Sequence, residues 1–212
     1  MNALNLSRVV FLLVVWLFFA IGFVNAQQGS ANIDGFRSAK FGMSQGEITN
    51  AIKKDFNIGE NDVTTQKNPL EKTTSLKISV TDLLPNSGPA EVFYILGHTT
   101  KNLIQINIIW SGASSETKII SDMAVTAETL KSYFLRQGFN KDDMVINAQL
   151  KDGSILFFRG TDTSGRMVIL QMLNPPKADS ESETGAKTTS LRLTYVQDPN
   201  TPDIFKVKQG DF

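Results

Sequence analysis

The chain contains no cysteine and a single histidine, His98. Without cysteine it can form no disulfide, use no thiol nucleophile and build no cysteine-ligated zinc site. It also has no residue to which the lipid of a bacterial lipoprotein could be attached. Stability must therefore come from a hydrophobic core, and 212 residues with 41% apolar composition are enough to build one.

An excess of charge of either sign is also missing. Lysine and arginine together number 21, as do aspartate and glutamate. Arg8 is the only charged residue before Asp34, so the charges of the rest of the chain nearly cancel. Nucleic-acid-binding domains usually carry a basic excess or a basic stripe. We therefore expect no nucleic-acid partner.

Common cofactor and metal motifs are absent as well. The chain has neither G-x-x-x-x-G-K-[ST] nor G-x-G-x-x-G, two glycine patterns that bind phosphates. His98 lies in an expected hairpin loop without a further ligand nearby in the sequence. Acidic clusters at residues 142–143, 179–183 and 198–203 lack the ligand pattern of a calcium loop, and nothing selects a carboxylate pair for glycoside hydrolysis. The sequence predicts no catalytic residue, no cofactor and no metal ligand.

The N-terminus has the anatomy of a secretory signal peptide. A polar start with Arg8 is followed by sixteen almost wholly apolar residues, 9–24, and then by Val24-Asn25-Ala26. We predict cleavage after Ala26 and a periplasmic or secreted protein without a stable membrane anchor. The alternative is a retained anchor. Sixteen helical residues rise only about 24 Å, short of the roughly 30 Å of a bilayer core.

The stretch FGMSQGEI, residues 41–48, has the features of a helix start. Ser44 suits the N-cap, and Glu47 stands three residues later, as in a capping box. Met43 and Ile48 occupy the positions of a hydrophobic staple. Apolar residues then recur at helical spacing as far as Phe56. We interpret the stretch as a helix terminus and assign it no ligand.

Alternating apolar and polar residues predict seven strands and a second helix. The helix is expected over residues 116–137. The strands are expected at 76–80, 91–96, 103–110, 144–150, 154–159, 166–173 and 191–196.

These elements suggest two α-β-β-β units in tandem, residues 27–112 and residues 113–212, the second with an extra C-terminal strand. Both units could also form one compact domain. Short hairpin loops imply antiparallel neighbours. We therefore predict an α+β fold, with an antiparallel sheet and helices packed on one face.

Helices on one face leave the other face of the sheet open to a partner. Polar residues that alternate with core residues should point there, and an aromatic residue could serve as an anchor. Because neighbouring strand residues face opposite ways, one of Phe157 and Phe158 should be exposed. The candidate partner-binding residues are Gln105, Asn107, Asn147, Gln149 and Phe158.

The first half of the chain resembles the BamE (SmpA/OmlA-like) envelope proteins and the wider set that shares the fold of beta-lactamase inhibitor protein. The resemblance rests on Phe41-Gly42-Met43-Ser44 with Glu47-Ile48, and on the strand that ends at Trp110. It implies a non-catalytic protein-binding scaffold in the cell envelope. It supplies no binding residues, because no site motif of the family is present here.

Two functions follow from these observations. The first is an exported, non-catalytic scaffold that binds an envelope protein, as an assembly factor or an enzyme inhibitor. The alternative is a carrier that holds a small ligand or lipid in a cavity between sheet and helices. A hydrolase that uses two carboxylates is a third and weaker hypothesis.

Overall fold

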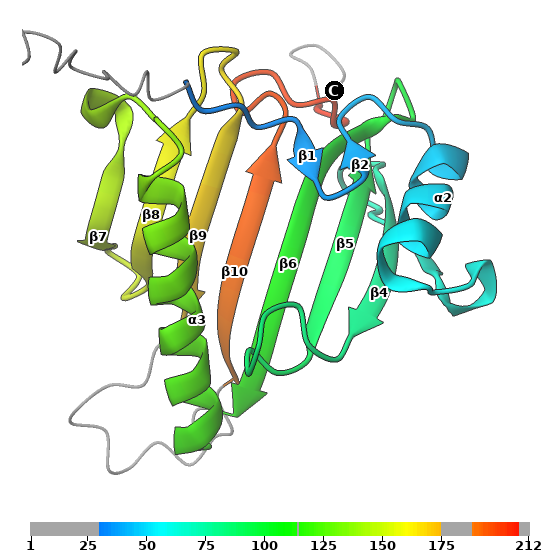
Figure 1. The fold of residues 1–212 in the computed structure, drawn as a ribbon. Helices are drawn as coiled ribbons and strands as arrows, with labels where there is room; N and C mark the ends of the chain where they lie inside the picture. Colours follow the sequence, from blue (N-terminus) through cyan, green and yellow to red (C-terminus); the bar gives the residue numbers. More distant parts are fainter. Residues whose placement is uncertain (1–29, 114, 175–187, 208–212) are drawn as a thin grey trace, which may run out of the picture.

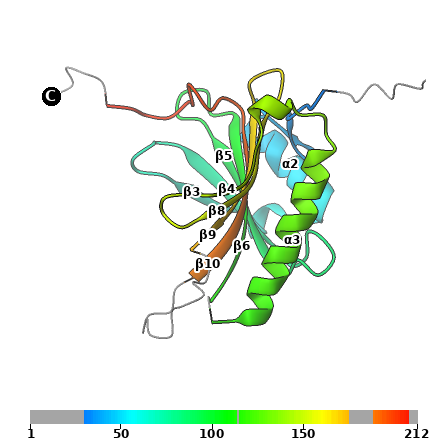
Figure 2. The same ribbon diagram turned by 90° about the vertical axis from the view of Figure 1, so that its left-hand side faces the viewer.

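The computed structural model describes residues 30–113, 115–174 and 188–207. The predicted signal peptide and the acidic residues 179–183 lie outside these ranges. The described chain has two α-helices, α2 (Gln45–Phe56) and α3 (Thr117–Leu135), and an antiparallel eight-stranded sheet. Both helices cover one side of this sheet, which we call the helix face, and the opposite side is the open face (Figures 1 and 2). The α+β class predicted from the sequence is confirmed.

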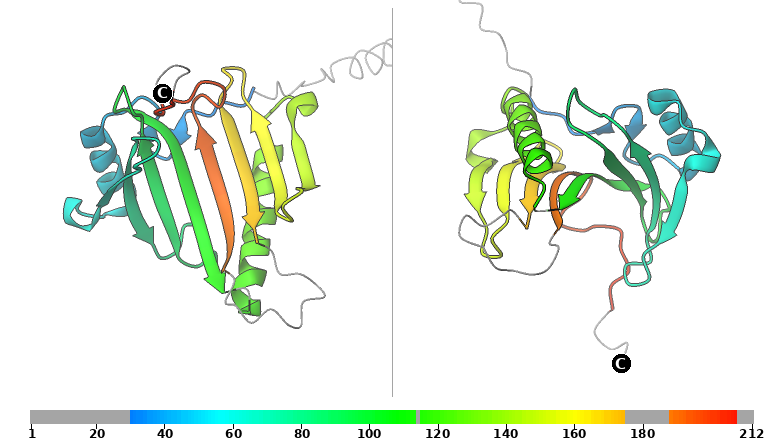
Figure 3. Two further views of the ribbon diagram at one scale, coloured as in Figure 1. Left: turned by 180° about the vertical axis from the view of Figure 1, so that it is seen from behind. Right: turned by 90° about the horizontal axis from the view of Figure 1, so that it is seen from below.

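The eight strands run in the order β3-β4-β5-β6-β10-β9-β8-β7. Each half therefore contributes one helix and four consecutive hairpin-linked strands, and β6 pairs with β10 where the halves meet. Seen from behind, the sheet is continuous across this junction and no helix of the described chain lies over it (Figure 3). The strands are β3 (Thr64–Lys67), β4 (Thr74–Val80), β5 (Ala90–Leu96), β6 (Leu103–Ala113), β7 (Val145–Gln149), β8 (Ile155–Thr161), β9 (Met167–Leu173) and β10 (Thr188–Val196).

The first unit has one strand more than the predicted three, whereas the four strands of the second unit match its three strands and extra C-terminal strand. The sequence of β3 is TTQK, and all four residues are exposed, so it carries no apolar alternation. The final strand, β10, belongs to the second unit and occupies the centre of the sheet. A small hairpin of β1 (Gly35–Phe36) and β2 (Ala39–Lys40) precedes α2, and short 3₁₀ turns occupy Glu60–Asp62 and Lys141–Asp143. No helix in the described ranges is long and apolar enough to cross a membrane.

Helix α2 begins as the sequence predicts. Ser44 is the N-cap, and the Glu47 carboxylate accepts hydrogen bonds from the Ser44 backbone N–H (2.8 Å) and hydroxyl (2.7 Å). Ile48 is fully buried, and the half-buried Met43 packs against the core. The helix ends at Asn57, which adopts the left-handed conformation. The motif is therefore accounted for by helix capping.

Replacing Glu47 with alanine should lower the free energy of unfolding, because both bonds to Ser44 are lost. Hydrogen bonds from the Ser44 side chain and backbone lower the pKa of Glu47. The contribution is therefore present above the pKa of the unfolded carboxyl and lost on acidification. Urea unfolding at neutral and acid pH measures it. The exposed Glu60 is a control, and an equal loss for Glu60→Ala would contradict the role of the cap.

The core lies between the helix face and the helices. Inward residues of the two central strands are buried, among them Ile106 and Ile108 on β6 and Leu191 and Leu193 on β10. Gly112 allows α3 to approach the sheet, because an added Cβ there would lie 2.5 Å from Cγ2 of Ile119. The helix face also carries the larger cavity that is described below.

Candidate functional site

Gln105 and Asn107 lie on the open face, as predicted. They alternate along β6 with the buried Ile106 and Ile108. The Gln105 side-chain amide donates to Oδ1 of Asn107 (3.0 Å), and the Thr194 hydroxyl donates to the same oxygen (3.0 Å). Their side chains are therefore half-buried and already bonded within the protein.

Asn147 and Gln149 do not belong to the open face, and this part of the prediction is wrong. Asn147 has a φ of +52° and falls between the paired residues Ile146 and Ala148 without a partner on β8. Its Oδ1 accepts a hydrogen bond from Nζ of Lys131 on α3 (3.0 Å). Gln149 pairs with Ile155, which packs against the core, so both belong to the helix face.

Phe158 is fully buried and cannot contact a partner, so its predicted role is also wrong. Its ring stacks on Phe134 of α3, with centroids 5.4 Å apart, and meets the edge of Phe139 at 5.3 Å. The β8–β9 register shifts between Leu156 and Phe158. Phe157 consequently also packs against the core, with Nζ of Lys131 5.9 Å from its ring centroid.

Among the residues that the structure describes, no catalytic constellation surrounds His98 or Ser44. Gly42–Gly46 has the spacing G-x-S-x-G, but Ser44 is in an extended conformation and its hydroxyl donates to Glu47. A nucleophile elbow needs a strained turn and a histidine base. His98 packs against the edge of the Phe205 ring, and its buried Nδ1 has no hydrogen-bond partner in the described part of the chain. No group of three or more potential metal ligands occurs within the described residues.

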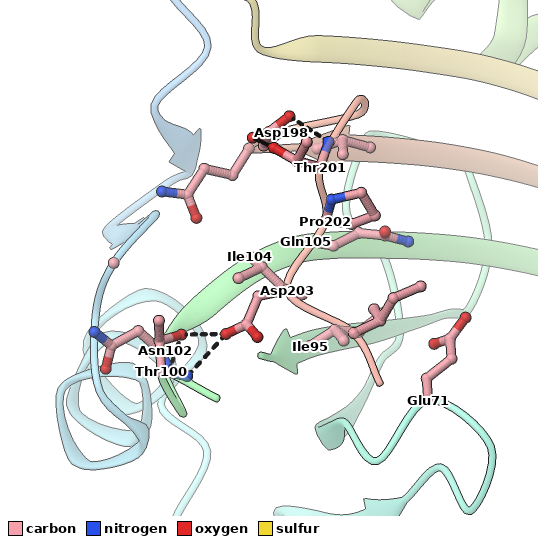
Figure 4. Close-up of a pocket in the computed structure, with 14 residues that line it drawn as sticks. Glu71, Ile95, Thr100, Asn102, Ile104, Gln105, Asp198, Thr201, Pro202 and Asp203 are labelled. Carbon is pink, nitrogen blue, oxygen red and sulfur yellow. Dashed lines mark hydrogen bonds between the residues drawn. The ribbon is translucent and has the colours of Figure 1, made fainter. Parts of the chain in front are cut away.

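The acidic residues near the C-terminus hold a strap, residues 197–206, against the β5–β6 loop. The Asp203 carboxylate accepts hydrogen bonds from the Thr99 and Thr100 backbones (2.9 and 2.8 Å) and from the Thr100 hydroxyl (2.7 Å). Asp198 accepts from the backbone and hydroxyl of Thr201 (Figure 4). A cavity of about 410 Å³ lies under the strap. Asp198 and Asp203, which line this cavity, both accept hydrogen bonds within the protein.

A larger cavity of about 670 Å³ lies on the helix face, and we call it the helix-face cavity. Its floor is formed by the central strands, with Ile108 and Trp110 from β6 and Leu193 and Tyr195 from β10. One wall is the C-terminal half of α3, and the opposite wall is the segment that carries β1 and β2 (Figure 1). The β4–β5 loop adds Leu83 and Leu84. Most of the lining is aromatic or aliphatic.

Two aspartates position the wall that is formed by the N-terminal segment. The buried Asp162, in the β8–β9 loop, accepts a hydrogen bond from the backbone of Ile33 (2.8 Å), and Arg166 donates to the Ile33 carbonyl (3.2 Å). Asp55 of α2 accepts from the backbone of Ser38 in the β1–β2 turn (2.8 Å). The cavity wall is therefore tied to the scaffold at both ends.

The floor contains a polar group without a partner. Trp110 is only 2% exposed, and its indole N–H makes no hydrogen bond with the described chain. Tyr195 is partly buried, and burial raises the pKa of its phenol. The deep part of the cavity is thus uncharged and largely apolar.

The mouth of the cavity carries most of its charge. Arg37, Lys40 and Arg136 are the cationic lining residues, and Asp34 is the single acidic one. Asp34 forms an ion pair with Lys40 (2.9 Å). Arg37 lies over the rings of Phe36 and Phe56, and Arg136 caps the end of α3. A net positive charge of two therefore remains at the mouth.

Sequence reasoning missed this site as a set of residues. It identified Trp110 as a core residue, but the walls come from segments about a hundred residues apart in the sequence. Comparison of the chain with protein-family models, with curated proteins and with solved structures gives no significant match.

Proposed function

We propose that the protein is a non-catalytic carrier that binds a small, largely apolar molecule in the helix-face cavity. The observation that carries this proposal is the lining of the cavity, in which most residues are aromatic or aliphatic and its floor comes from the two central strands.

Size and lining support the same function. Ligand pockets typically measure about 300–1,000 Å³ and are lined by apolar and aromatic side chains with few polar groups. The helix-face cavity, at about 670 Å³, lies within that range. Export, predicted from residues 1–26, would make it a carrier of the cell envelope or the exterior.

A protein-binding scaffold, the first function expected from the sequence, has less support. Of its five candidate residues, Phe158 is buried, and Asn147 and Gln149 belong to the helix face. Gln105 and Asn107 do lie on the open face, but they are bonded to each other. We therefore place the carrier function above it.

Blocking the cavity tests the proposal. Leu130 projects from α3 into the lining, and Leu130→Trp should fill part of the space. Purified protein is extracted with organic solvent, and the bound molecules are counted per protein by mass spectrometry. We expect a discrete molecule in the wild type and at least about tenfold less in the variant, corresponding to 1.4 kcal/mol.

Leu70→Trp is the matched control, because Leu70 is 81% exposed in the β3–β4 loop and does not line the cavity. It should retain the wild-type content. An equal content in both variants would place the molecule elsewhere. The carrier function would be contradicted if the wild-type protein yields no bound molecule on extraction and also binds no added apolar probe.

A further inference from the structure

Building on the proposed carrier function, we propose that the ligand is an amphiphile whose head group is an oxyanion, such as a carboxylate or a phosphate, held by Arg136 at the mouth of the helix-face cavity. The ligand tail would then lie over the floor formed by β6 and β10. The argument rests on the gradient of exposure, on the charge of the mouth and on the lack of a partner for Arg136.

The solvent exposure of the lining residues differs between the two ends of the cavity. Floor residues such as Ile108, Trp110 and Leu193 are almost inaccessible to solvent. Tyr133, one turn before the end of α3, is 49% exposed, and Arg136 is exposed as well. A bound molecule therefore meets apolar surface at one end and a solvated, cationic rim at the other. An amphiphile matches both ends, whereas a wholly apolar molecule matches one.

The cations at the rim are not equally free. Lys40 is paired with Asp34, and Arg37 donates to the carbonyl of Asp55 (3.2 Å) while its guanidinium covers aromatic rings. The guanidinium of Arg136 forms no hydrogen bond or ion pair with any described residue. Five donors in a planar fork are therefore available for an oxyanion.

The partial negative charge at the C-terminus of α3 repels an anion, but it is smaller than the positive charge of Arg136. A helix C-terminus carries a partial charge of about −0.5. The backbone N–H groups of Arg136 and Gln137 already satisfy the carbonyls of Tyr133 and Phe134. One full positive charge on Arg136, with that of Arg37 nearby on the lining, leaves the mouth positive.

Fluorescence of Trp110 can follow binding directly. Of the two tryptophans in the chain, Trp16 lies in the predicted signal peptide, so the protein cleaved after Ala26 keeps Trp110 alone. This protein is titrated at pH 8 with dodecanoate, dodecyl phosphate, dodecanol and dodecyltrimethylammonium, each below its aggregation concentration. We expect both anions to bind at least about tenfold more tightly than the alcohol and more tightly still than the cation. The ratio of the two anions distinguishes a carboxylate ligand from a phosphate ligand.

Substitution of the arginine identifies the residue responsible. Arg136→Gln should weaken binding of both anions at least about tenfold and leave dodecanol unchanged, with an unaltered melting temperature. Arg159→Gln is the matched control, because Arg159 is exposed and its β9 partner Ile169 lies on the open face. It should bind all four probes as the parent does.

Three outcomes are decisive. Selectivity for anions that disappears with Arg136 supports the proposal. Equal binding of dodecanol and dodecanoate, or anion binding that survives Arg136→Gln, would overturn the head-group assignment and leave the carrier function standing. Binding of none of the four probes would count against both.

Discussion

Replacing Phe158 with alanine should lower the free energy of unfolding by about 3–5 kcal/mol, since a fully buried ring is removed from the core. The ring packs between Phe134 on α3 and Phe139 just beyond it. Its loss would remove aromatic contacts on both sides and leave a cavity under the helix. Urea unfolding followed by circular dichroism measures the change.

Two further variants keep this prediction testable if the alanine protein does not fold. Phe158→Leu retains much of the apolar volume and should lose only about 1 kcal/mol. Phe205→Ala is the control, because Phe205 is 40% exposed on the strap, and it should lose no more than about 1 kcal/mol. A loss below about 1 kcal/mol for Phe158→Ala would mean that Phe158 is a surface residue, as the sequence suggested.

That comparison marks where sequence reasoning succeeds and where it fails. Local signals were reliable: the capping pair Ser44 and Glu47 fixed the start of α2, and the alternation from Leu103 onward predicted β6. Both depend on residues within one turn or one strand of each other. β3 was missed because its four residues are all polar, and its strand form depends on pairing with β4.

The error at Phe158 has a different origin. Strict alternation would send Phe157 and Phe158 to opposite faces, but a register shift on β8 and the unpaired Asn147 on β7 place both rings on the core side. Asparagine tolerates positive φ better than most residues. The only hints in the sequence were thus an asparagine within a predicted strand, Asn147, and two consecutive aromatic residues in the following strand, Phe157 and Phe158.

The helix-face cavity could not be predicted for a topological reason. Its floor needs β10 beside β6, a pairing between strands about eighty residues apart. Its wall needs Asp162 to hold the backbone of Ile33, a contact across 129 residues. No periodicity within either segment encodes such contacts. Among the cavity residues, only Trp110 stands out in the sequence, because it is the single tryptophan after residue 26.

The second large effect is expected at the strap, where the Asp203 carboxylate accepts three hydrogen bonds from Thr99 and Thr100 in addition to the backbone bonds of the strap. Burial raises the pKa of Asp203, but the hydrogen bonds from Thr100 and Thr99 together have a larger opposite effect. The resulting pKa is about 2, below the usual carboxyl value. A depressed pKa means that the ionised form stabilises the fold. This contribution is present above the usual carboxyl value of 3.8 and is lost as the pH falls towards 2. Asp203→Ala should lose about 2 kcal/mol at pH 7, and the difference from wild type should shrink at pH 2.

Gly97 should be coupled to Asp203, because an added Cβ would lie 2.2 Å from the Oδ2 atom of Asp203 and 2.9 Å from the Thr100 hydroxyl oxygen. Its φ is not in the left-handed region, so space alone forbids a side chain. Gly97→Ala should therefore displace the carboxylate and cost about 2 kcal/mol, similar to Asp203→Ala. The double variant should lose little more than either single variant, with a coupling energy of about 1–2 kcal/mol. Simple additivity in urea unfolding would show that Gly97 and Asp203 act independently and that the strap is held by other contacts.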